Sequence, residues 1–243
     1  MSLTPDALYY QLGGLAAEIP ELATGPITPE TRQWIERALA LVECSGGLAD
    51  KIQLRVATDN LDGPLRARNA QTIIAIVQRT LAKAELDAPP QSQGSFIVAS
   101  NAFDAFAAVR KVLGTARADV LLVDANADAK VLTDFAVLAP GDVVVRLLAD
   151  RSDHKRSLEA AARRWVQQFG DARPLFVRLA AAGTLSDTLI LVDGDTAWAL
   201  GQSFNKLARR AYPALVRMPQ DAAASMIASY AARWEAAGPL SEG

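Results

Sequence analysis

The chain has 243 residues, 51% of them apolar, with a formal net charge of −2 and a single cysteine, Cys44. This length suits one large domain or two small ones, and the near-neutral charge gives no global argument for nucleic-acid or membrane binding. One cysteine excludes an internal disulfide and a multi-cysteine zinc site.

No apolar run approaches the roughly 18–20 residues of a membrane span. The N-terminus also lacks the basic and apolar regions of a signal peptide. Together with the single cysteine, which fits a reducing compartment, these features lead us to expect a soluble cytoplasmic protein without a transmembrane segment.

Residues 4–86 are predicted to form a bundle of amphipathic helices. Thr4-Pro5 and Thr28-Pro29 each place a capping hydroxyl before a proline at the first helical position. A third helix is expected over residues 48–58, and the turn at 60–64 precedes a fourth with apolar residues at helical spacing. Short loops between such helices favour an antiparallel bundle.

Residues 87–94 contain two prolines and a glycine without apolar periodicity, which predicts a linker. From 95 to 238, apolar strands alternate with helices, which predicts an α/β domain whose mixed sheet is covered by helices. Strands are expected at 96–99, 120–123, 143–148, 175–179 and 215–217, with helices at 102–113, 129–138, 157–169 and 221–234.

The most informative segment is a predicted hairpin in this second domain. Its first strand ends in Asp193-Gly194, and its second leads into Gly201-Gln202-Ser203. This layout resembles the second half of the phospholipase D superfamily motif, His-x-Lys-x4-Asp followed by Gly-x-Asn/Ser. Ser186 stands at the His position, Thr188 at the Lys position, and Asp193 matches the Asp position.

The resemblance implies a phospholipase D-like half-domain that pairs as a homodimer. In active members one His attacks phosphorus, the other protonates the leaving group, and the lysines hold the phosphate oxygens. Here Ser186 has no base within its own motif and Thr188 carries no charge. We therefore expect a catalytically inactive protein that acts as a binding or adaptor module.

Two other hypotheses stay open. One is a diverged phosphodiesterase, of phospholipase or nuclease type, that uses a remodelled pocket with residues such as Asp187, Asp193 and Ser203. It requires these side chains to converge within hydrogen-bond reach. The other is a purely structural oligomeric scaffold without a ligand.

Ser203 and Asn205 match positions that line the phosphate pocket of the family, although Ser203 is equally explained as a helix cap. Three residues of a basic stretch are further candidates for contacting phosphate, or else form a solvated surface. They are Arg151, Lys155 and Arg156. Asp193-Gly194 is itself better explained as a simple hairpin turn after a strand.

The remaining candidates give weaker predictions. His154, the only histidine, is either a relocated acid–base group or a solvated surface residue. With one His, one Cys and no nucleotide-binding, zinc or calcium motif, we predict no cofactor and no metal site. The expected partners are a second copy of the chain and either a phosphate-bearing ligand or another protein. Trp198, on the hairpin, is expected to pack beside the dimer seam.

Overall fold

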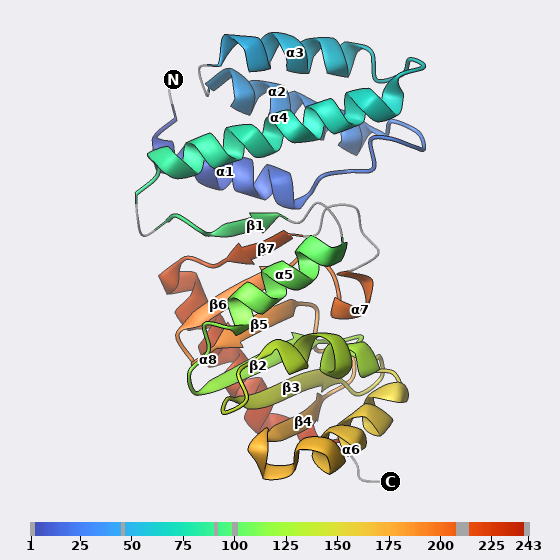
Figure 1. The fold of residues 1–243 in the computed structure, drawn as a ribbon, viewed down its shortest axis with the longest axis vertical. Coiled ribbons are helices and arrows are strands. Elements are labelled where there is room, and N and C mark those ends of the chain that lie inside the picture. The colour runs from blue at the N-terminus through green and yellow to red at the C-terminus, as the bar shows by residue number, and fades with distance from the viewer. Residues whose placement is uncertain (1–2, 45–46, 90–91, 99–101, 208–213, 241–243) are drawn as a thin grey trace. The chain divides into compact units, whose positions relative to one another are not determined.

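The computed structural model describes residues 3–44, 47–89, 92–98, 102–207 and 214–240. The chain divides into two compact units, residues 1–95 and 96–243 (Figure 1). The first unit is helical, and the second contains the sheet. The predicted fold class, an N-terminal helical bundle followed by an α/β domain, is confirmed.

The helical unit contains α1 (Pro5–Ala17), α2 (Pro29–Cys44), α3 (Leu48–Asp59) and α4 (Arg66–Asp87). The predicted helix starts are correct, because the Thr4 hydroxyl accepts from the Ala7 N–H at 3.3 Å and the Thr28 hydroxyl accepts from the Thr31 N–H at 3.2 Å. Helix α4 packs against the other three and provides the centre of the core.

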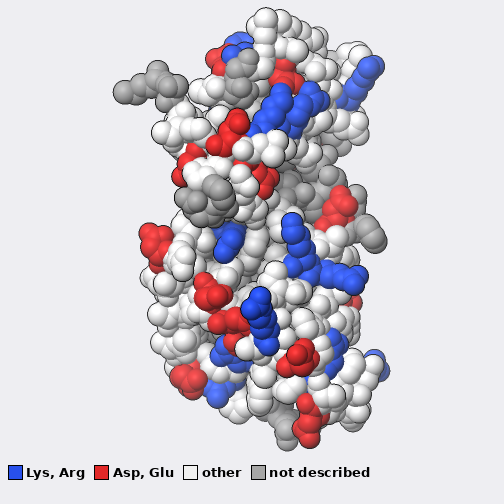
Figure 2. Space-filling view, turned by 60° about the vertical axis from the view of Figure 1, so that its left-hand side comes forward, with Lys and Arg blue, Asp and Glu red and all other residues white. Residues whose placement is uncertain are grey.

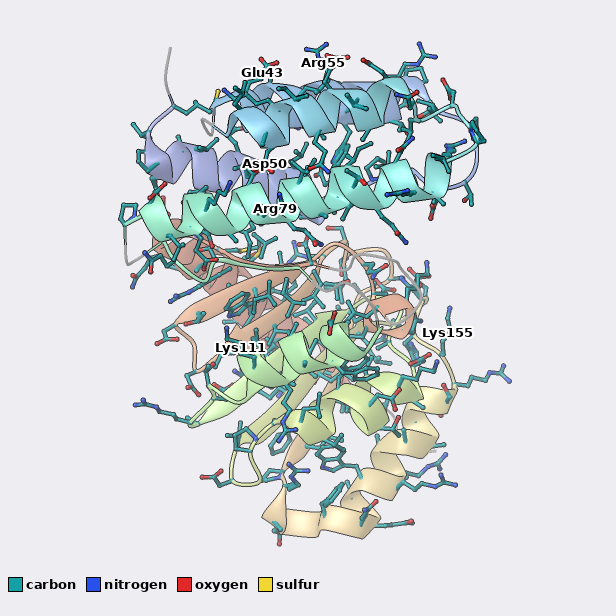
Figure 3. The ribbon with its side chains drawn as sticks, turned by 45° about the horizontal axis from the view of Figure 1, so that its top comes forward. Glu43, Asp50, Arg55, Arg79, Lys111 and Lys155 are labelled. Carbon is teal, nitrogen blue, oxygen red and sulfur yellow. The ribbon has the colours of Figure 1, made fainter. Side chains whose placement is uncertain are left out.

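A buried carboxylate ties α3 to α4. Asp50, in the first turn of α3, accepts hydrogen bonds from Arg79 at 2.6 Å and from Lys83 at 2.9 Å (Figure 3). The Lys83 hydrogen bond is the largest influence on the Asp50 pKa, and with Arg79 it outweighs burial and holds this pKa below its ordinary value.

The segment after α4, where the sequence predicts a linker, is held against the helical unit at its C-terminal end. Ser95 is buried, and its N–H donates to the Tyr9 hydroxyl of α1 at 3.0 Å. The Gly94 N–H donates to the Glu85 carboxylate at 2.7 Å. Residues 90 and 91 lie outside the described part of the chain.

The described strands of the α/β unit form one sheet in the order β1-β7-β6-β5-β2-β3-β4-β8. Strands β2, β3 and β4 run parallel, and the other neighbours pair antiparallel. The elements are β1 (Phe96–Val98), α5 (Ala102–Leu113), β2 (Asp119–Asp124), η1 (Val131–Phe135), η2 (Ala136–Leu138), β3 (Val144–Asp150), α6 (Ser157–Phe169), η3 (Gly170–Ala172), β4 (Leu175–Ala180), β5 (Thr188–Val192), β6 (Thr196–Leu200), α7 (Phe204–Leu207), β7 (Ala214–Arg217), α8 (Gln220–Ala236) and β8 (Gly238–Pro239).

Helices cover both faces of this sheet (Figure 1). Helices α5 and α6 and the turns η1 and η2 bury one face, and α8 runs along the other. Trp198 of β6 lies in the first of these cores, only 9% exposed, so its side chain packs within the unit.

Two details differ from the sequence-based expectation. Residues 129–138 do not form a regular α-helix: a π-helical turn at 131–135 is followed by a 3-10 turn at 136–138. The first predicted strand is described only to Val98, because Ala99 lies outside the described residues. No helix in the described parts of the chain is both long and apolar enough to cross a membrane.

Candidate functional site

The register of the central strands β2, β5 and β6 brings several candidate residues to the same end of these strands. Asp124, the last residue of β2, pairs with Thr188, the first residue of β5. Thr188 in turn pairs with Leu200, the last residue of β6. The ends of β2 and β6 and the start of β5 therefore meet, and the segments beyond them surround a common space.

An open pocket of about 390 Å³ occupies this space. Residues 124–126, 186–189 and 199–203 line it, together with Lys206 and Met218. The structure thus brings together four residues that the sequence had already marked as candidates: Ser186, Asp187, Thr188 and Ser203. It adds Asp124, Gln202 and Lys206.

Asp124 forms the buried floor of the pocket. Its Oδ2 accepts from the Ser203 hydroxyl at 2.7 Å and from the Phe204 N–H at 2.9 Å, and its Oδ1 accepts from the Asn126 N–H at 2.9 Å. Burial is the largest influence on this carboxyl and raises its pKa above the ordinary value, because the three hydrogen bonds offset the loss of hydration only in part.

Helix α8 fixes the segment that enters β5. The Tyr230 hydroxyl donates to the Asp187 carboxylate at 2.7 Å, and Arg233 donates to the Thr184 carbonyl at 2.6 Å. Burial, followed by the hydrogen bond to Asp187, raises the pKa of Tyr230 well above its ordinary value. Asp187 therefore lines the pocket as a carboxylate that already has a hydrogen-bond donor.

Two amide side chains near the pocket have unused hydrogen-bonding atoms. The Gln202 Nε2 atom is buried and has no partner among the described residues, and the same holds for Asn205 Oδ1. Asn205 Nδ2 donates to the Asn126 carbonyl at 3.2 Å, so this side chain braces the loop after β2. It is not among the residues that line the pocket.

Asp193 lies away from this pocket, at the opposite end of β5. Its carboxylate accepts from the backbone N–H groups of Arg117, Ala118 and Asp119 at 2.8–3.1 Å. Burial acts to raise its pKa, but these donors outweigh it and leave the pKa below its ordinary value. With φ at 53°, Asp193 occupies the left-handed region, followed by Gly194 at 68°, as a tight hairpin turn requires.

The basic stretch also lies outside the pocket lining. Arg151, Lys155 and Arg156 are exposed and belong to the loop between β3 and α6, with Lys155 at the periphery of the α/β unit (Figure 3). On the face shown in Figure 2, basic and acidic residues are interspersed. His154 is half-buried in the same loop, with its Nδ1 2.8 Å from the Asp150 carbonyl oxygen.

The chemistry available at the pocket is hydrogen bonding, with one ammonium group, that of Lys206, and two acidic side chains, Asp124 and Asp187. Neither His nor Cys is among the described residues that line it. The Ser186 hydroxyl has no acid–base partner among the described residues, whereas Ser203 is paired with Asp124. No group of three or more metal-ligating side chains occurs in the described parts of the chain.

No protein-family model matches the chain, and no curated protein matches its sequence. Solved structures of similar fold include Nuc of Salmonella typhimurium, a phospholipase D family member, at 15% identity and a TM-score of 0.47 over 60% of this chain and 97% of that one. NucT from Helicobacter pylori shows 11% identity and a TM-score of 0.43 over 60% and 99%. The archaeal chromatin protein TrmBL2, described as binding DNA in a novel mode, shows 14% identity and a TM-score of 0.42 over 97% and 94%.

The first of these structures comes from the family that the motif hairpin resembles. At such identities the likeness is one of fold, and the candidate site has to be interpreted from its own residues.

Proposed function

We propose that this chain is a catalytically inactive phospholipase D-like protein that binds a phosphate-bearing ligand in the pocket at the ends of β2, β5 and β6. It acts as a homodimeric binding or adaptor module. One observation carries the proposal: the pocket offers several hydrogen-bond donors and one cation, but its exposed serine has no base.

The donors suit an anionic acceptor. Ser186, just before β5, and Thr188, its first residue, contribute hydroxyl groups. Lys206 contributes an exposed ammonium group. Phosphate oxygens accept hydrogen bonds from all of these groups, and those from a charged donor are the strongest.

The same residues argue against turnover. A serine hydroxyl is a weak nucleophile at neutral pH unless an adjacent base activates it. Ser186 has no such base among the described residues, and Asp187 next to it is engaged by Tyr230. Binding without reaction is the outcome that this arrangement supports.

A diverged phosphodiesterase is the second candidate, and one contact favours it. Ser203 donates to Asp124, a carboxylate whose pKa is raised by burial, and a serine paired with a base is the arrangement of an activated nucleophile. However, Ser203 is only 7% exposed, so a substrate reaches its oxygen poorly. Asp193, which the sequence-based version of this hypothesis included, lies at the other end of β5.

The test uses bis(p-nitrophenyl) phosphate as a probe and inorganic phosphate as a second ligand. Calorimetry and thermal shift report binding, and p-nitrophenol release in the same samples reports hydrolysis. We expect binding without release. We also expect weaker binding in Lys206→Gln and unchanged binding in Lys111→Gln, a matched exposed lysine on α5 (Figure 3).

Two results would contradict the proposal. Hydrolysis that disappears in Ser203→Ala would establish the phosphodiesterase. A melting temperature that neither phosphate compound changes would point to a protein partner or a scaffold, since a ligand that binds only the folded state must stabilise it.

A further inference from the structure

Helix α3 exposes an apolar stripe on the side that faces away from its own bundle. Leu48, Ile52 and Val56 are spaced by four residues, so they lie on one face of the helix, where they are 71%, 57% and 56% exposed. The opposite face buries Leu54 and Ala57 in the helical unit. A surface helix ordinarily carries polar residues on its outer face, so this stripe indicates a surface that is covered by a partner.

Charged side chains of both signs border the stripe. Lys51 and Arg55, one turn apart on α3, lie along the same side of it. Arg55 forms an exposed ion pair with Glu43 of α2 at 3.5 Å (Figure 3), and Asp59 lies at the C-terminal end of the stripe. These four groups together carry no net charge. An anionic lipid surface or a nucleic acid would be attracted by an excess of positive charge, whereas a balanced border suits a partner surface that is itself mixed in charge.

We propose that this stripe docks on the same stripe of a second copy of the chain, with the two α3 helices antiparallel across a twofold axis at Ile52. The inference rests on the homodimer of the proposed function and assigns it to a surface of the helical unit. A twofold axis matches a surface with itself, so the two Ile52 side chains meet, and Leu48 of each copy lies beside Val56 of the other. The apolar side chains that each copy exposes to water are then buried together.

The small and polar neighbours of the stripe fit this symmetry. Ala49, on the side of the stripe opposite Arg55, is exposed and small, so it permits the close approach of two helices. The ion pair between Arg55 and Glu43 holds one charge of each sign, and the twofold axis brings the two pairs to the same side of the interface. Each arginine there faces the glutamates of both copies. The antiparallel arrangement also places Asp59 toward the N-terminal end of the other α3, where the helix dipole favours a negative charge.

The experiment compares three proteins by light scattering after size exclusion, over a range of concentrations: the parent chain, Ile52→Glu, and Val166→Glu as a control. Val166 on α6 is exposed to nearly the same extent as Ile52, 59% against 57%. We expect dimers of the parent and the control, and a halved mass for Ile52→Glu because two carboxylates would meet at the axis. Urea unfolding of each variant verifies that it is folded.

A cysteine variant tests the geometry independently of charge. With Cys44 replaced by serine, Ile52→Cys should form a disulfide-linked dimer on mild oxidation, because helices packed about 8–10 Å apart bring side chains on their line of contact within disulfide range. Lys111→Cys, on α5, should not.

Each remaining outcome decides the question. A dimer that survives Ile52→Glu, or that does not crosslink through residue 52, overturns this interface but leaves the proposed homodimer standing. A parent chain that is monomeric at all concentrations overturns both. Flotation with phosphatidylglycerol vesicles is run beside it, and binding of a monomeric parent that Ile52→Glu abolishes would assign the stripe to a lipid surface instead. Phosphate-probe binding tests the pocket separately, and Ile52→Glu should leave it unchanged.

Discussion

Replacing Asp193 tests whether this residue stabilises the fold or contributes to ligand binding in the pocket. This residue matches the aspartate of the motif, but its carboxylate caps three successive N–H groups where the chain enters β2. We expect Asp193→Asn to destabilise the fold and to leave phosphate-probe binding unchanged.

The magnitude follows from the contacts. A hydrogen bond to a charged acceptor contributes about 1.5–3 kcal/mol, and exposed donors recover much of this from water. Arg117 and Ala118 are exposed, so we expect Asp193→Asn to lower the free energy of unfolding by about 2–3 kcal/mol in total. Asp193→Gly removes the carboxylate without conformational strain, whereas Asp193→Ala adds roughly 1–2 kcal/mol at a positive φ.

The assay is urea unfolding of these variants at several pH values. The donors hold the folded-state pKa of Asp193 below its unfolded value, so its stabilisation is complete above an unfolded pKa of about 3.9 and is lost as the pH falls through the folded pKa. The gap between the parent and Asp193→Asn should close over that range. A loss below about 0.5 kcal/mol at pH 7, against the 2–3 kcal/mol expected from charged hydrogen bonds, would refute this reasoning.

Three further predictions concern other polar contacts. Ser203→Ala removes one donor from the buried Asp124 carboxylate, so we expect a loss of about 1–3 kcal/mol in urea unfolding, smaller at acid pH where Asp124 is protonated. A loss that did not change with pH would contradict this. Asp50→Asn should cost about 1–2 kcal/mol, since its two cationic partners are half exposed and stay solvated. Because Lys83 and Arg79 lower the pKa of Asp50, the loss of stability in Asp50→Asn should decrease as the pH falls. A loss in thermal unfolding that stayed the same at every pH would argue against the ion pairs. Tyr230→Phe should cost about 1 kcal/mol and speed amide exchange around Asp187, and unchanged exchange there would show that the tyrosine does not fix this segment.

Local signals predicted most elements of this fold. The threonines that precede Pro5 and Pro29 marked the starts of α1 and α2, and Asp193-Gly194 marked the hairpin turn, because caps and turns depend on neighbouring residues alone. The π-helical turn at 131–135 was missed because its apolar spacing differs little from that of an α-helix.

The site was predicted only in part, because its contacts join distant segments. Ser203 reaches Asp124 across 79 positions of the chain, and an aspartate that ends an apolar strand gives no local sign of such a partner. Conversely, Asp193 was grouped with Ser186 because they are close in sequence. The extended strand β5 lies between them and places them at opposite ends of the strand.

The length of β5 has a consequence for how this chain can change. Its five residues, at about 3.3 Å each, separate the pocket from the Asp193 cap by roughly 17 Å. Substitutions that far apart, without shared partners, have additive effects on stability. Substitutions at the pocket end of β5 therefore leave the stabilisation provided by the Asp193 cap at the other end largely unchanged. A scaffold divided in this way can gain or lose a reaction by point substitution.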